Sequence, residues 1–97
     1  MANQFITIPV PAGNGIGASV NVSNTKALKS VLVGSIQSAT VTIEVSQNGS
    51  DFAPVLRFDQ PGNVDTLQLI AFSIRTRVEN FVPGVSVSPT VSLGAEV

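Results

Sequence analysis

The sequence predicts an all-β protein, a single small antiparallel β-sandwich or barrel of about seven to eight short strands with an extended N-terminal arm. Three observations lead to this class. Residues 41–58 contain two extended runs joined by a Gln-Asn-Gly-Ser turn at 47–50. Apolar and polar residues alternate again over 71–79. Turn residues such as Gly, Pro and Asn recur at short intervals along the chain, as they do between the strands of a sandwich.

The first strand of the hairpin is the clearest element. Val41, Ile43 and Val45 alternate with Thr42 and Glu44. Because successive side chains of a strand point to opposite faces, this pattern predicts one apolar face and one solvated face. The Asn-Gly pair in the following turn is a strong hairpin signal.

The N-terminal residues 1–15 are expected to form an extended arm or an edge strand, and residues 16–97 to form the β-sandwich domain. Pro9 and Pro11 exclude a helix and disfavour a central strand. We favour the arm, because prolines stiffen an extended chain that has no ladder partner. Three glycines over 12–17 predict a loop.

Residues 26–34 are ambiguous. Leu28, Val31 and Leu32 fit one stripe of a helix, whereas the β-branched residues and the closing Gly34 fit a strand. Neighbouring segments are strands and no long cap-and-stripe pattern is present, so a strand is preferred.

Two segments follow the hairpin. Residues 64–70 alternate and predict either a strand or one short helical turn. In the next segment Ile74, Thr76 and Val78 share one face while charged residues occupy the other. The alternation breaks near Phe81, which predicts a bulge or a strand end there.

Composition limits the classes of function. The chain has 97 residues, of which 43% are apolar and only 11% charged, against a norm of about 25% charged. The net charge is −1, and three arginines and two lysines form no basic run, so nucleic-acid binding is not expected. A weakly charged surface is poorly protected against association, so we expect the protein to lie against other protein, as an oligomer or in an assembly. A neutral monomer coated with Ser and Thr is the alternative.

Sequence features bear on location as well. The chain contains no Cys, so the redox compartment cannot be inferred. No run of about 18 apolar residues is present, and no membrane span is expected. The N-terminal residues lack the basic and apolar regions of a signal peptide, so synthesis in the cytoplasm without a cleaved signal is expected.

Catalysis is not expected. The chain has no His, which excludes an imidazole base or ligand. Asp51, Asp59 and Asp65 lie in or beside predicted turns, where Asp is common. Asn48, Ser50 and Asp51 carry oxygen atoms that suit calcium, but the EF-hand pattern is absent and turn formation explains them better. We expect no enzyme activity, no cofactor and no metal.

Two segments provide candidate interface residues. Phe5, Ile6 and Ile8 belong to the proposed arm, which would reach a neighbouring subunit. Arg75 and Arg77 share one face of a strand. A solvated face with cross-strand ion pairs and a subunit interface, where Arg is enriched, both explain these two arginines.

The aromatic residues point away from sugar binding. The chain has no Trp or Tyr, the residues on which sugars usually stack. Its five phenylalanines lie at or beside apolar strand positions and are expected in the core. They are Phe5, Phe52, Phe58, Phe72 and Phe81.

The chain from residue 41 onward resembles small β-sandwich proteins of tailed-phage virions, the head decoration (cement) proteins and related structural proteins. The shared pattern is the run VTIEVSQNGSDFAPV, then the strand and turn AFSIRTRVENFVPG, then PTVSLGA near the C-terminus. Discoidin-type sandwiches that bind sugar or lipid share the hairpin. The residues that carry the resemblance are Glu44, Ser46, Asn48, Gly49, Phe52, Pro54, Ile74, Arg75, Arg77, Val78, Pro83 and Gly84.

The resemblance implies a structural function. Copies would bind the outside of an icosahedral capsid shell and clamp neighbouring capsid subunits, often as trimers. The implied partners are the major capsid protein or another virion protein, and further copies of the chain, and the implied location is the capsid surface of the virion. The alternatives are a tail or baseplate component, a host-surface or glycan-binding module, and an unrelated small β-domain.

Overall fold

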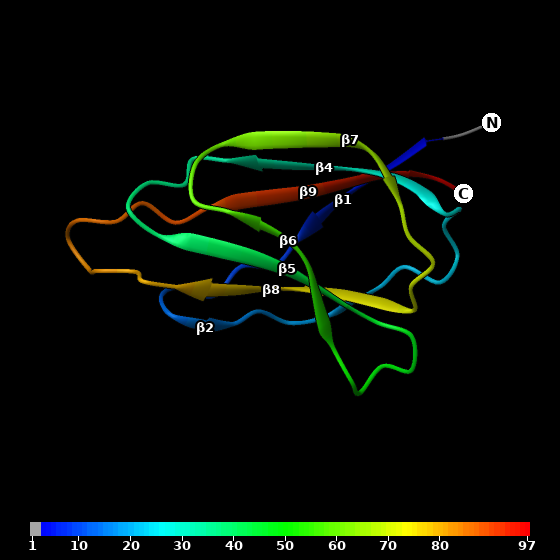
Figure 1. The fold of residues 1–97 in the computed structure, drawn as a ribbon, viewed down its shortest axis with the longest axis horizontal. Coiled ribbons are helices and arrows are strands. Elements are labelled where there is room, and N and C mark those ends of the chain that lie inside the picture. Colours follow the sequence, from blue (N-terminus) through cyan, green and yellow to red (C-terminus); the bar gives the residue numbers. More distant parts are fainter. Residues whose placement is uncertain (1–2) are drawn as a thin grey trace.

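The computed structural model describes residues 3–97 as two antiparallel β-sheets packed face to face (Figure 1). The first sheet has the strand order β1-β9-β4-β7, and the second has the order β2-β8-β5-β6, with β3 also paired to β8. The β-sandwich predicted from the sequence is therefore confirmed. The strands are β1 (Asn3–Ile8), β2 (Gly15–Ile16), β3 (Val20–Asn21), β4 (Leu28–Gly34), β5 (Thr40–Ser46), β6 (Ala53–Phe58), β7 (Gly62–Gln68), β8 (Ser73–Glu79) and β9 (Thr90–Glu96).

The predicted hairpin is present as β5 and β6. Its turn is built by Asn48, whose side-chain Oδ1 accepts hydrogen bonds from the backbone N–H groups of Ser50 and Asp51, both at 2.8 Å. Gly49 has a φ of 83°, a left-handed conformation that favours glycine. The Asn-Gly pair thus fixes the turn by side-chain hydrogen bonding and by backbone freedom.

Most of the ambiguous segment 26–34 is a strand: Leu28–Gly34 form β4, in the interior of the first sheet between β9 and β7. Val31 and Val33 point into the core, whereas Leu28 and Leu32 point outward and are more than half exposed. The leucines that fitted a helical stripe therefore lie on the outer face of a sheet. The segment after the hairpin is likewise a strand, β7.

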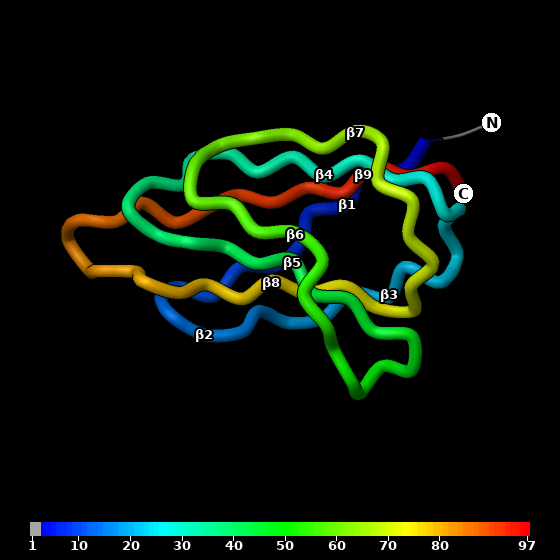
Figure 2. The backbone as a smooth tube through the Cα atoms, in the orientation of Figure 1, coloured from blue at the N-terminus to red at the C-terminus, as the bar shows by residue number. Residues whose placement is uncertain are grey.

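The first described residues form an edge strand. β1 pairs along its whole length with β9, from Asn3 opposite Glu96 to Ile8 opposite Val91. Of the two forms that the sequence left open for this segment, the structure shows the edge strand rather than an arm. Pro9 follows the last paired residue, where its missing N–H costs no ladder hydrogen bond. The start of β1 and the end of β9 lie at one end of the sandwich, opposite the loop between β8 and β9 (Figure 2).

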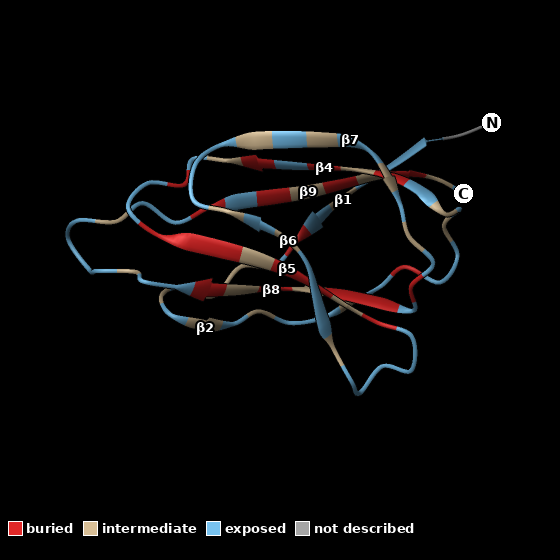
Figure 3. Ribbon diagram, in the orientation of Figure 1, coloured by how far each residue is buried: buried red, intermediate tan, exposed pale blue. Residues whose placement is uncertain are grey.

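The core consists of aliphatic side chains, most of them β-branched. Figure 3 shows that the buried residues lie along strands of both sheets. Val33, Val41 and Ile43 have no exposed surface. The expectation that the five phenylalanines form the core is wrong, because none of them is fully buried. Medium-sized side chains from facing strands already fill the space between the two sheets. Phe58 and Phe81 pack at its margin, and the other three lie on outer faces or loops.

One charged side chain enters the interior. Lys29 of β4 is 2% exposed, and its Nζ donates hydrogen bonds of 2.7 Å to the backbone carbonyls of Lys26 and Leu69. Burial lowers the pKa of Lys29 below its ordinary value of 10.5. The lysine therefore joins the segment before β4 to the segment after β7.

We expect Lys29→Ala to lower the free energy of unfolding by about 1–3 kcal/mol, because it leaves two carbonyls without their donor and removes the packed stem. Lys29→Met keeps the stem and should cost less.

The lowered pKa of Lys29 predicts a pH dependence. Between the folded pKa and 10.5 the unfolded chain binds more protons than the folded chain, so the wild type should gain stability relative to Lys29→Met as the pH rises toward 10.5. Urea unfolding at pH 8 and about pH 10 measures this difference, and an equal pH dependence of the two proteins would contradict it.

Candidate interface surfaces

The outer face of the second sheet carries a cluster of charged side chains centred on Glu44 of β5. The register places Glu44 opposite Arg75 of β8, and Arg77 lies two residues further along that strand, on the same face. Glu44 Oε1 accepts a hydrogen bond of 2.7 Å from Arg75 Nε, and Oε2 accepts one of 2.9 Å from Arg77 Nε. One carboxylate thus binds two arginines across the strand pair.

Electrostatics favour the ionised form of this carboxylate. The Glu44 side chain is 8% exposed, and burial alone would raise its pKa. The hydrogen bonds from Arg77 and Arg75, with their positive charges, outweigh burial and hold the pKa of Glu44 below its ordinary value. The cluster is therefore an ion-pair network at neutral pH.

Phe52, just before β6, fixes the position of Arg75. The Arg75 guanidinium carbon lies 3.9 Å from the centre of the Phe52 ring, a cation–π contact. Arg75 is thus held by Glu44 and by an aromatic ring, and 22% of its side chain is exposed. Arg77 is more open, at 37%. The cross-strand ion pairs anticipated for these two arginines are present, and both keep exposed surface that a partner can contact.

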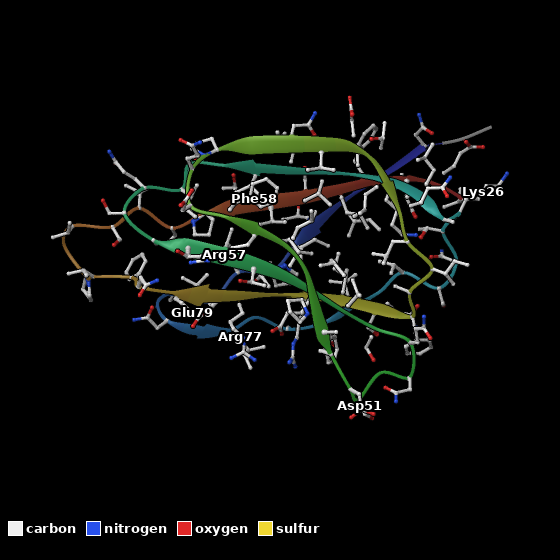
Figure 4. All side chains as sticks on the ribbon, viewed as in Figure 1. Lys26, Asp51, Arg57, Phe58, Arg77 and Glu79 are labelled. Carbon is white, nitrogen blue, oxygen red and sulfur yellow. The ribbon has the colours of Figure 1, made fainter. Side chains whose placement is uncertain are left out.

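An open groove of about 660 Å³ runs beside this cluster along β5 and β6. Arg57, Arg77 and Glu79, which are labelled in Figure 4, line it together with Glu44. Arg57 is exposed and makes no ion pair with any residue from 3 to 97. The groove is thus a mixed-charge surface, suited to polar contacts with another macromolecule.

The outer face of the first sheet has a different character. Phe5 of β1 is 79% exposed, and Leu28 and Leu32 of β4 are 53% and 54% exposed. The Phe5 ring lies against Gly94 of β9, where an added Cβ would approach the ring to 3.2 Å and Ser30 Oγ to 2.6 Å. Three large apolar side chains and small residues therefore share this face, which is typical of a protein contact.

A second apolar surface is the loop between β8 and β9, which projects from one end of the sandwich in Figure 1. Val82, Val85 and Val87 are exposed by 52%, 64% and 42%. The Val82 carbonyl accepts hydrogen bonds from the N–H groups of Val85 and Ser86, at 3.1 and 2.9 Å. Ser86 Oγ accepts one from Val82 N–H and donates one of 2.6 Å to the Ser38 carbonyl. We call residues 82–87 the valine loop; its hydrogen bonds hold the valines in solvent.

Sequence reasoning identified the Val-Pro-Gly turn in this loop but missed its exposed valines. A signal was available, because no charged residue occurs between Glu79 and Glu96. These 16 residues are too many for one strand, so part of the uncharged stretch has to form the loop before β9. The apolar residues of that loop were therefore candidates for exposure.

The five candidate interface residues do not form one surface. Phe5 is exposed on the first sheet, while Arg75 and Arg77 lie on the outer face of the second. Ile6 packs against the core, and Ile8 is 1% exposed within it. Their side chains point inward because they alternate with Phe5 along β1, so they stabilise this chain's own sandwich.

The described part of the chain contains neither a cluster of metal-ligating side chains nor a membrane-spanning helix. Among residues 3–97, no group of three or more acidic, His or Cys side chains is placed to hold a metal ion. Those residues also include no helix with the length and hydropathy needed to cross a membrane.

The fold and these surfaces define a small antiparallel β-sandwich with exposed apolar side chains on both sheets and in the segments before and after β8. Neither a protein-family model nor a curated protein matches the sequence. The chain is similar in structure to the SPBc2 prophage-derived protein YomS, with a TM-score of 0.71 over 97% of this chain and 92% of that one. The two sequences are 11% identical, so this similarity establishes the shared fold.

Proposed function

We propose that the chain is a structural protein of a tailed-phage virion, and that it is a capsid decoration protein which binds the outer shell and stabilises contacts between capsid subunits. The observation that carries the proposal is the likeness of the whole chain to a prophage-derived protein of the same fold. The resemblance of residues 41–95 to decoration proteins supports the finer assignment. On this proposal the protein acts by binding alone and needs no reaction chemistry.

The valine loop supports attachment to a protein surface. Its three valines are exposed although the loop is held by hydrogen bonds, so little conformational entropy is lost when a partner covers them. Burial of apolar side chains in a partner's pocket is a common source of binding energy. We assign the valine loop as the part of the chain that contacts the shell.

The weak overall charge supports a repetitive assembly. The net charge is −1, so many copies can lie close together on a shell with little mutual repulsion. The proposed partners are accordingly the major capsid protein or another virion protein, and further copies of the chain, with a trimer as the form that the resemblance implies. The proposed location is the capsid surface.

The test uses phage particles produced from a genome in which the gene for this chain has been deleted. Purified protein is added, unbound protein is removed, and the bound copies are counted by gel densitometry and located by cryo-electron microscopy. Decoration predicts many copies in fixed ratio to the major capsid protein, on the shell. Copies confined to the tail would indicate a tail or baseplate component instead, and the absence of bound copies would refute a virion role.

A substitution in the valine loop tests the contact itself. Val85→Asp should weaken binding to these particles by about tenfold or more, because it places a charge in an apolar contact. Ser88→Asp adds the same charge at an exposed position just outside the loop and serves as the control. Equal losses in both variants would indicate a general effect of charge and exclude the valine loop as the contact.

A further inference from the structure

The two sheets have free edges that differ in how they are protected. In the first sheet β1 and β7 are the outermost strands, and in the second sheet β6 lies at one edge and the short β2 and β3 at the other. An edge strand exposes unpaired N–H and C=O groups, which can pair with a strand of another chain. Proteins usually block such edges with charges, Pro, bulges or short strands.

Three of these edges carry blocking features. β6 contains Pro54 and Arg57, and its pairing with β5 is interrupted by a register shift. β7 carries Asp65, and its pairing with β4 is also shifted. β2 and β3 have only two residues each. None of the three offers a long, regular and neutral edge.

β1 has none of these features. Its six residues, NQFITI, include no charge, no Pro and no Gly. The strand pairs with β9 without a register shift, so its backbone is regular along its whole length. Among residues 3–97 no strand pairs with its other side.

We propose that β1 pairs in antiparallel fashion with β1 of a second copy about a two-fold axis, which joins the first sheets of the two copies into one continuous sheet. A two-fold axis brings identical strands together, so like charges on the strand would repel each other. β1 carries no charge and is therefore compatible with itself. The edges formed by β6, β7, β2 and β3 are blocked, so the edge of a second copy that can pair with β1 is its own β1.

Phe5 sets the register of this pairing. It lies at the centre of residues 3–7, and pairing around it places Phe5 of each copy opposite the other, with Asn3 opposite Thr7. Outward residues then lie opposite outward residues, so the apolar outer faces of the two sheets become continuous. The pairing covers Phe5, whose side chain is 79% exposed in the single chain.

The interface is short, since one strand pair over residues 3–7 buries far less surface than a permanent dimer. The dimer should therefore be weak and dependent on concentration. The inference does not depend on the proposed capsid role. It also differs from the trimer that the resemblance implies, so the two ideas can fail separately.

Light scattering coupled to size-exclusion chromatography tests the pairing over a concentration series. The mass should rise from that of the 10.0 kDa chain toward twice that value. The double variant Gln4→Lys, Thr7→Lys changes two exposed side chains of β1 and should keep the mass of a single chain at all concentrations. The control Ala53→Lys, Val55→Lys adds the same charges to exposed positions of β6 and should still dimerise.

Several results would overturn the inference. They are a wild type that stays monomeric at every concentration, a trimer, or a dimer that survives in the β1 variant. Loss of the dimer in the β6 control as well would show that added charge alone prevents association. Thermal unfolding of both variants checks that each remains folded, and their melting temperatures should lie close to that of the wild type.

Cysteine cross-linking tests the register, because the natural chain has no Cys to interfere. In the proposed register the Cα atoms of the two copies of residue 5 lie about 4.5–5.5 Å apart, within disulfide range. The two copies of residue 7 lie about 13 Å apart, beyond that range. Mild oxidation should therefore cross-link Phe5→Cys and leave Thr7→Cys monomeric on a non-reducing gel. Cross-linking at neither position, or equally at both, would overturn the register.

Discussion

Deletion of residues 1–8 is expected to lower the free energy of unfolding by about 3–5 kcal/mol, a large part of the roughly 5–15 kcal/mol that stabilises a domain of this kind. The deletion removes Ile8, which is 1% exposed in the core, and Ile6, which packs against the core. It also uncovers one side of β9 along the whole length of its pairing with β1. Urea unfolding of the purified proteins measures the loss.

Deletion of residues 1–4 is the matched control. Asn3 and Gln4 are exposed, so this shorter deletion leaves both isoleucines in place and should change stability by about 1 kcal/mol or less. If the protein without residues 1–8 unfolded at the same urea concentration as the wild type, β1 would be a detachable arm, as the prolines first suggested, rather than part of the sandwich.

Replacement of Glu44 with Gln is expected to cost about 1–3 kcal/mol at pH 7, because the amide cannot accept charge-assisted hydrogen bonds from both Arg75 and Arg77. The estimate is below that for a fully buried pair, since the Arg77 side chain is 37% exposed and solvent screens its charge. The substitution also leaves two arginines side by side without their shared counter-charge.

The pH dependence of this effect follows from the lowered pKa of Glu44. The ordinary value is 4.5, and the folded value lies below it. Between the two values the unfolded chain binds more protons, so the contribution of Glu44 is fully present above pH 4.5 and is lost as the pH falls through the folded pKa. The wild type and Glu44→Gln should therefore converge in stability in acid.

Urea unfolding of both proteins at pH 7 and at about pH 3 measures the convergence. Asp65→Asn, which removes one exposed carboxylate from β7, is the control and should differ little from the wild type at pH 7. An unchanged gap between the wild type and Glu44→Gln across this range would mean that the ion pairs do not contribute to stability.

Alternation of side chains was sufficient to predict the fold class and the strands that have one solvated face. β5 and β8 alternate over seven residues each, and the structure confirms both as strands. The face of β5 predicted to be solvated is nevertheless covered, because Thr40, Glu44 and Ser46 are buried. β4 was harder to predict, because Leu28 and Leu32 are apolar and yet exposed, so that both of its faces look apolar in the sequence. Only pairing with β7 and β9 distinguishes this pattern from a helix.

The sites were less predictable than the strands, because they depend on which strands become neighbours. Glu44 and Arg75 are 31 residues apart in sequence, and their ion pair exists only because β5 and β8 are adjacent. Residue type was also a poor guide to burial for the phenylalanines. Phe5 occupies an outward position of β1 and is exposed, although it is a large apolar residue.

The arrangement of the two chain ends has a practical consequence for engineering. Asn3 lies opposite Glu96, at the far end of the sandwich from the valine loop. A fluorescent protein or peptide antigen fused after Val97 through a flexible linker would therefore project away from the proposed capsid contact. Particles coated with such fusions could display foreign cargo in many copies while the attachment surface remains unmodified.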